Sequence, residues 1–85
     1  MTVDLFEIHD FLLFLNKSYP KINITARYDF ASFTLCIQIS PKFYHENVEY
    51  YSGQSSVFDT KTCISHINDA FTAYLAYLSH RGIKL

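Results

Sequence analysis

The chain has 85 residues, a net charge of −1, and 49% hydrophobic against 18% charged residues. This length allows one domain with one core, and the composition is that of a globular protein rather than a disordered segment. Seven Lys or Arg against eight Asp or Glu exclude a strongly basic nucleic-acid binder and a strongly acidic mimic of DNA.

The first predicted element is an amphipathic helix over residues 5–17. Asp4 can cap its N-terminus, and Glu7 three residues later completes a capping box. Pro20 ends the helix because it disfavours helical geometry at the preceding residue. The apolar residues fall on one helical stripe that we expect in the core: Leu5, Ile8, Phe11, Leu12 and Leu15.

The hydrophobic period then changes from 3.6 to 2. Apolar and polar residues alternate over 22–30 and again over 33–39, which predicts two half-buried strands. Their connection near Ala31 and Ser32 is so short that the strands must pair antiparallel. Pro41 ends the second strand.

Residues 42–58 give the weakest pattern. A third strand is expected over residues 47–51, with Val48 inward and Tyr50 either inward or exposed, and Gly53 breaks it. Residues 55–58 then form a short extension of the strand or a loop.

The last predicted element is a helix over residues 60–80. Asp59 or Thr60 caps it, and Gly82 can take the left-handed conformation that follows a helix. A continuous apolar stripe runs along it: Cys63, Ile64, Ile67, Ala70, Phe71, Tyr74, Leu75 and Leu78.

This order predicts an α+β fold, α-β-β-β-α, in which both terminal helices pack on one face of a three-stranded antiparallel sheet. The other face stays open and polar, with Asn23, Thr25, Arg27, Thr34, Cys36 and Gln38. The order of elements resembles that of the double-stranded RNA-binding domain, which uses lysines at the start of its second helix. Here that start carries only Lys61, so the resemblance is limited to the architecture.

No catalytic residue, metal site, cofactor or small-molecule substrate is indicated. The four histidines lack the spacing of helical metal ligands, and two glycines cannot form a phosphate-binding loop. Cys63 and His66 are three residues apart, but Cys63 belongs to a buried stripe and is expected to be a core residue. We expect Cys36 and Cys63 to be free thiols. With no long apolar run and no basic leader, the chain is expected in the cytoplasm and not in a membrane.

Apolar side chains beyond the need of the core are the main functional indication. Phe6 and Leu13 fall on the far side of the first helix, and Phe14 on its flank, unless the third strand or the 42–58 segment covers them. A second aromatic group surrounds the irregular segment, where some members can instead point inward. The candidate partner-binding residues are Phe6, Leu13, Phe14, Phe43, Tyr44, Tyr50 and Tyr51.

We therefore expect a small non-enzymatic protein-interaction module that regulates or inhibits another protein, as many accessory proteins of phages and mobile elements do. The partner is another protein or a second copy, since symmetric dimers are common. One alternative is a nucleic-acid module that uses the open sheet face with Arg27 and an outward Tyr51. The other alternative is a non-catalytic subunit of a larger complex.

Overall fold

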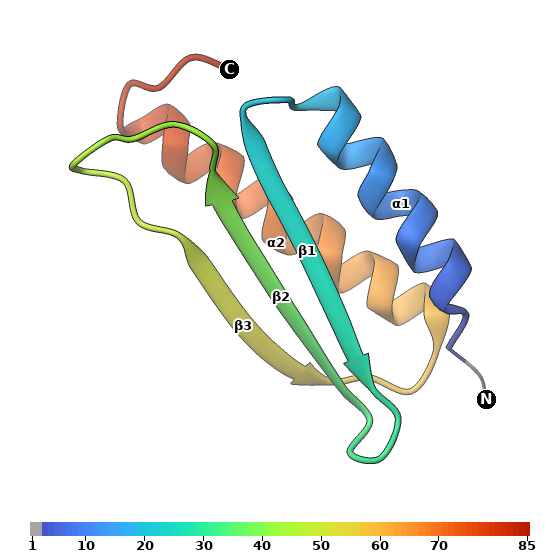
Figure 1. The fold of residues 1–85 in the computed structure, drawn as a ribbon. Coiled ribbons are helices and arrows are strands. Elements are labelled where there is room, and N and C mark those ends of the chain that lie inside the picture. The colour runs from blue at the N-terminus through green and yellow to red at the C-terminus, as the bar shows by residue number, and fades with distance from the viewer. Residues whose placement is uncertain (1–2) are drawn as a thin grey trace.

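The computed structural model describes residues 3–85 and has the predicted order α-β-β-β-α. The helices are α1 (Leu5–Ser18) and α2 (Thr60–His80), and the strands are β1 (Ile22–Asp29), β2 (Thr34–Pro41) and β3 (Tyr51–Ser56) (Figure 1). Both strand pairs are antiparallel, in the order β1-β2-β3. The predicted fold class is confirmed.

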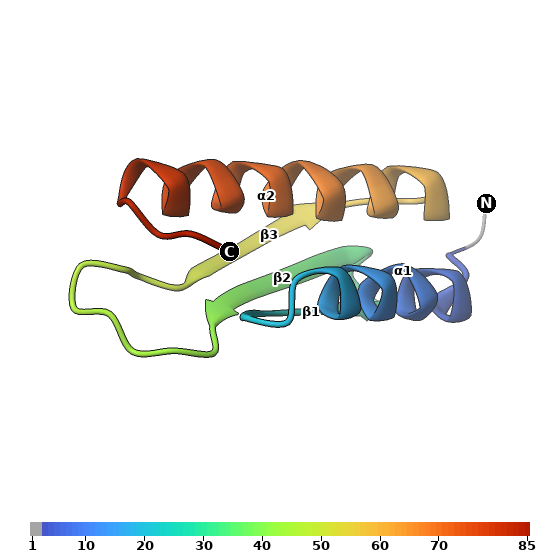
Figure 2. The ribbon, with the colours of Figure 1, turned by 90° about the horizontal axis from the view of Figure 1, so that it is seen from above.

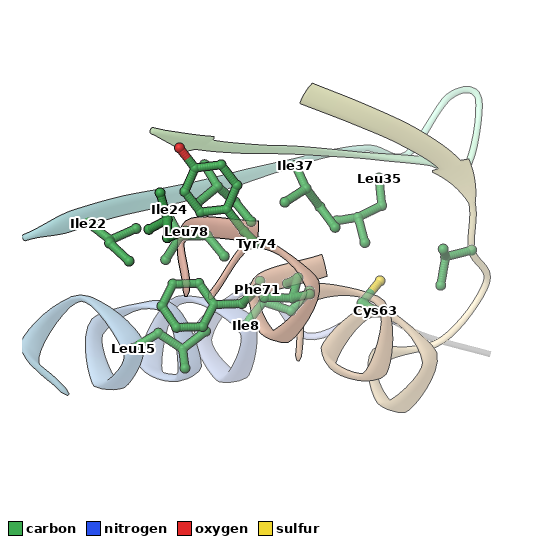
Figure 3. Close-up of a cluster of buried hydrophobic side chains, with 13 residues drawn as sticks. Ile8, Leu15, Ile22, Ile24, Leu35, Ile37, Cys63, Phe71, Tyr74 and Leu78 are labelled. Carbon is green, nitrogen blue, oxygen red and sulfur yellow. The ribbon is translucent and has the colours of Figure 1, made fainter. Parts of the chain in front are cut away.

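The sheet and the two helices form two layers. Helix α2 lies behind the sheet, and α1 runs along the margin formed by β1 (Figures 1 and 2). Both helices lie on the same side of the sheet, and the core fills the space between the layers (Figure 3). The buried side chains are Ile8, Leu15, Ile22, Ile24, Leu35, Ile37, Ile39, Val57, Cys63, Ile67, Phe71, Tyr74 and Leu78. No helix within residues 3–85 is long and apolar enough to cross a lipid bilayer.

Acidic side chains cap both helices, as predicted. Asp4 Oδ1 accepts hydrogen bonds from the main-chain N–H groups of Phe6 and Glu7 at 2.9 and 3.3 Å, and Asp59 caps α2. Only this half of the predicted capping box is formed, because the N–H of Asp4 donates to Thr60 Oγ1 at 2.7 Å instead of to the Glu7 side chain. The starts of the two helices are therefore tied together.

The prediction of a third strand over residues 47–51 is wrong, since β3 begins where that strand was expected to end. In the observed register Ile39 pairs with Tyr51, so the next pair on this side of β2 would place Pro41 opposite Glu49. Proline has no N–H to donate, and the ladder stops there. Gly53 was expected to break the strand but lies inside β3.

Residues before β3 instead dock onto α2. The C=O of Glu49 accepts from the hydroxyl of Tyr74 at 2.8 Å, and the N–H of Glu49 donates to the hydroxyl of Tyr77 at 3.0 Å. The same Tyr77 hydroxyl donates to the C=O of Asn47 at 3.4 Å. The Tyr74 hydroxyl thus replaces the donor that Pro41 lacks, and Tyr77 holds the adjoining main chain on α2. Val48 packs against the core as predicted, whereas Tyr50 is exposed.

The connection between β1 and β2 is longer than predicted. Strand β1 ends at Asp29 and β2 starts at Thr34, so Phe30 and Phe33 belong to the turn and not to the strands. The carboxylate of Asp29 accepts from the N–H of Ala31 at 2.9 Å and from the Ser32 hydroxyl at 3.0 Å. These donors, the N–H of Ala31 first, lower the pKa of Asp29. Phe33 has a positive φ of 53°.

Candidate partner-binding surface

The residues predicted on the back of α1 are exposed. Phe6 is 82% exposed, Phe14 62% and Leu13 43%, so neither β3 nor the segment before it covers them. Phe14 stacks on the ring of Phe11 at a centroid distance of 6.4 Å. The alternative in which these side chains are buried by the irregular segment is wrong.

The second predicted aromatic group lies elsewhere. Residues 42–50 form a loop at the end of the sheet away from the first turn of α1 (Figures 1 and 2). Tyr44 and Tyr50 are exposed there, and Phe43 is half-buried. Phe6, in the first turn of α1, therefore lies at the other end of the molecule from Tyr44 and Tyr50 and does not share one surface with them.

A groove runs between the first half of α1 and the second half of β1. It has a volume of about 510 Å³ and we call it the α1–β1 groove. Its lining residues are Leu5, Phe6, Ile8, His9 and Leu12 from α1, Ala26, Arg27 and Tyr28 from β1, and Leu35 from β2. Leu5 was expected in the core but is 48% exposed, and it lines this groove opposite the small side chain of Ala26.

Aromatic side chains continue this groove around the β1–β2 turn. Phe30 packs edge-on against Tyr28 at 4.9 Å, and Phe33 packs on Phe58 at 5.2 Å. The two pairs are joined through Val57, whose C=O accepts from the Tyr28 hydroxyl at 2.5 Å. Phe30, Phe33 and Phe58 are each about half exposed. We call Tyr28, Phe30, Phe33 and Phe58 the hairpin-end cluster, and this cluster together with the α1–β1 groove the hairpin-end surface.

Most of the hairpin-end surface was missed from the sequence. Phe30 and Phe33 continue the alternation of the two strands, so they were assigned to the core face. The signal against that assignment is Ala31 and Ser32, because a tight two-residue hairpin turn needs Gly or Asn at such positions. Their absence requires a longer turn, and a longer turn takes both phenylalanines out of the strands.

Cys63 and His66 do not form a nucleophilic pair. Burial, and secondarily the charge of Asp59, raises the pKa of the Cys63 thiol, which disfavours the reactive thiolate. His66 does not face it as a base: its Nδ1 is 3.0 Å from the Ser55 hydroxyl, which links β3 to α2. No group of three His, Cys, Asp or Glu within residues 3–85 can hold a metal ion.

The open face of the sheet is polar, as predicted, but it carries no aromatic side chain within the three strands. Tyr51 pairs with Ile39, and directly paired residues point to the same face. Tyr51 therefore faces the helices, where its ring lies over Gly53. The prediction of an outward Tyr51 is wrong, and the open face lacks the stacking group that single-strand binding uses.

A basic pocket occupies the other end of the molecule. It has a volume of about 550 Å³ and is lined by Lys21, Lys42 and Lys84, with His45, Phe43, Pro20, Gly82 and Ile83. Phe43, one of the predicted partner-binding residues, lies here. The pocket combines three positive charges with an aromatic ring.

Comparisons with protein-family models, with curated proteins and with solved structures give no match to this chain.

Proposed function

We propose that this chain is a small non-enzymatic protein-interaction module, which binds another protein through the hairpin-end surface and regulates or inhibits it. One observation carries the proposal. Phe6 is largely exposed, and Phe30, Phe33 and Phe58 are each about half exposed. Phe6 and Tyr28 line the α1–β1 groove, and the hairpin-end cluster continues from Tyr28. Contiguous apolar surface of this kind is rare on monomers and marks interaction sites, and aromatic anchors beside a pocket dominate binding energy.

The backbone of Phe33 supports the same surface. A φ of 53° is unfavourable for a bulky residue, and glycine would adopt it without strain. The Phe33 ring packs on Phe58 but stays about half exposed, so folding gains little from it. Strain of roughly 1–3 kcal/mol at an exposed residue is typical of functional positions.

We place the protein in a reducing compartment such as the cytoplasm. Cys36 and Cys63 are both free, and Cys63 is fully buried in the core. Disulfides would be expected in a small domain from an oxidising compartment.

A nuclease-treated pull-down at high salt with the tagged chain tests the proposal. The wild-type chain is expected to retain a protein partner in fixed stoichiometry. Phe6→Ser with Phe30→Ser is expected to lose that partner while the circular dichroism spectrum stays unchanged, because exposed substitutions shift stability by only about 0.5 kcal/mol.

Tyr44→Ser with Tyr50→Ser is the matched control, since these side chains are exposed at the other end. Loss of the partner from the control alone would move the binding surface to the 42–50 loop. Self-association that the first variant abolishes would make the partner a second copy. An isolated chain that precipitates unless it is co-expressed with its partner would favour a permanent subunit of a complex.

The basic pocket supports a second candidate, binding of a nucleic acid through its phosphates. Three lysines and Phe43 at one site offer phosphate and stacking contacts, which the open sheet face lacks. Three phosphate contacts to a single strand predict a log–log salt slope of roughly −2. Fluorescence anisotropy with a labelled single-stranded oligonucleotide measures it, and Lys42→Glu should weaken binding if the pocket is used.

A further inference from the structure

The main-chain groups of β1 alternate between its two edges. Ile24 shows which residues point away from β2: its N–H donates to Asn16 Oδ1 at 3.0 Å, and its C=O accepts from Asn16 Nδ2 at 2.9 Å. The N–H of Ile22 likewise points away and donates to the C=O of Tyr19 at 3.0 Å. The register with β2 is continuous, so the alternation places the main-chain groups of Ala26 and Tyr28 at the outer edge too.

The fold covers only the first half of this edge. Tyr19 satisfies the outer N–H of Ile22, and Asn16 satisfies both outer groups of Ile24. Within residues 3–85, the N–H and C=O groups of Ala26 and Tyr28 have no hydrogen-bond partner at the outer edge. Two residues thus offer two donors and two acceptors in one plane.

The open half of the edge lies at the α1–β1 groove. Ala26 and Tyr28 line that groove together with Leu5, Ile8 and Leu12 of α1. Ala26 is the smallest residue on the helix-facing side of β1, and Leu35 of β2 also lines the groove. Unpaired strand groups and an apolar groove therefore occupy the same place.

We propose that this site binds an extended segment of the partner protein, which adds a strand beside β1 at Ala26 and Tyr28. The proposal rests on the proposed function and defines how the partner is held. An extended main chain matches donors and acceptors at a strand edge, whereas a helix has already used its own. Side chains of the added strand alternate, so those opposite Ala26 and Tyr28 enter the groove.

The charge of Arg27 indicates which residue of the added strand lies between the two that enter the groove. Arg27 points to the open face and is exposed, so the residue opposite Arg27 also lies on the open face. An acidic side chain there forms a cross-strand pair with Arg27. The expected recognition sequence is therefore apolar–acidic–apolar in extended conformation.

The other edge of the sheet fits such a segment less well. The main-chain groups of β3 also alternate between its two edges. Those of Tyr51, Gly53 and Ser55 point toward β2. Those of Ser52, Gln54 and Ser56 therefore point outward. The β3 sequence is Tyr-Ser-Gly-Gln-Ser-Ser, so an added strand would gain main-chain bonds but would meet only one large apolar side chain of β3, that of Tyr51. This edge supplies a control of the same kind.

The test uses linear 12-residue peptides displayed on phage, selected on the folded full chain. Selected sequences are expected to share the apolar–acidic–apolar pattern, and a synthetic peptide of that sequence should slow hydrogen exchange of the Ala26 and Tyr28 amides. Ala26→Pro removes an N–H that no residue of the fold uses and fixes φ near the values that an edge strand tolerates, and it should weaken binding at least tenfold. Ser52→Pro makes the same change at the β3 edge and should leave binding unchanged.

Ala26→Val fills the groove with a strand-forming residue and should also lose the peptide, which keeps the test decisive if the proline variant fails to fold. Arg27→Glu should shift selection from acidic to basic residues at the middle position. Peptides that bind Ala26→Pro and Ala26→Val as tightly as wild type, but not the Phe6→Ser, Phe30→Ser variant, would overturn strand addition and leave the proposed function standing. Sensitivity to Ser52→Pro alone, or no selected peptide, would also overturn the inference, and the pull-down then decides the function separately.

Discussion

The side chain of Asn16 replaces a neighbouring strand at the covered half of the β1 edge. Its Nδ2 donates to the C=O of Leu12 at 2.8 Å and to the C=O of Ile24 at 2.9 Å, and its Oδ1 accepts from the N–H of Ile24 at 3.0 Å. All three bonds are partly buried. Asn16→Ala is therefore expected to destabilise the fold substantially, although the residue lies on a helix that is otherwise held by apolar packing.

The magnitude follows from the groups left without partners. A hydrogen bond contributes about 0.5–1.5 kcal/mol net, and an unsatisfied buried group costs about 1–3 kcal/mol. Water can reach part of this edge, so two lost partners at Ile24 give a total of roughly 2–4 kcal/mol after the few tenths gained from alanine in a helix. A chain of this size has roughly 4–13 kcal/mol of stability, and the melting temperature should fall by roughly 10–25 °C.

Urea unfolding followed by circular dichroism measures the effect, with Asn68→Ala as the control. Asn68 is exposed on α2, so its replacement should be neutral or slightly stabilising. Asn16→Asp keeps the acceptor for the N–H of Ile24 but removes the donor to its C=O. Its free energy of unfolding near neutral pH should therefore lie below that of the wild-type chain. Equal unfolding free energies for Asn16→Ala and Asn68→Ala, within about 0.5 kcal/mol, would refute the role of Asn16 at the edge.

Three further outcomes are expected. Phe33→Gly should leave stability unchanged or higher, since strain is relieved, while it weakens partner capture in the pull-down; lower stability with normal capture would contradict the interpretation of the turn. Tyr74→Phe should cost about 1 kcal/mol and speed hydrogen exchange in residues 47–50, because Glu49 loses its donor; unchanged exchange would separate that bond from the order of the loop. Main-chain N–H donors lower the pKa values of Asp29 and Asp59, so stability should hold above the ordinary carboxyl pKa and fall as pH drops through the lowered values. Asp29→Asn with Asp59→Asn should reduce this loss of stability at low pH, as measured by urea unfolding at several pH values. An unchanged loss would show that other groups cause the acid sensitivity.

The helices were predictable because their signals are local. Asp4 and Asp59 cap them in the structure, Pro20 and Gly82 follow them, and the apolar period between is regular. The third strand depends on a residue that is distant along the chain. Pro41 decides where β3 can begin, through a pairing with Glu49 that depends on register and cannot be read from residues 47–51 themselves.

The candidate partner-binding surface likewise has parts that depend on local sequence and parts that depend on tertiary packing. Exposure of Phe6, Leu13 and Phe14 follows from the angle between successive helical residues, and it was predicted. The α1–β1 groove depends on which β1 residue faces α1 and how large it is, so it required the packing of two elements. The hairpin-end cluster required the turn length, which the Ala31–Ser32 pair determines indirectly.

The contrast between the two halves of the β1 edge bears on why the edge is open at all. Exposed strand edges favour aggregation, and proteins protect them with charged or polar side chains, prolines or a covering element. Helix α1 runs beside all of β1, and Asn16 shows that one amide on its inner side satisfies a strand residue. One and two turns earlier, the same side of α1 carries Leu12 and Ile8, which cannot pair with the main chain of Ala26. An asparagine or glutamine at those positions would protect the edge but remove the apolar wall. The chain has the apolar wall and the open edge together, a combination that matches an extended apolar segment better than it matches water.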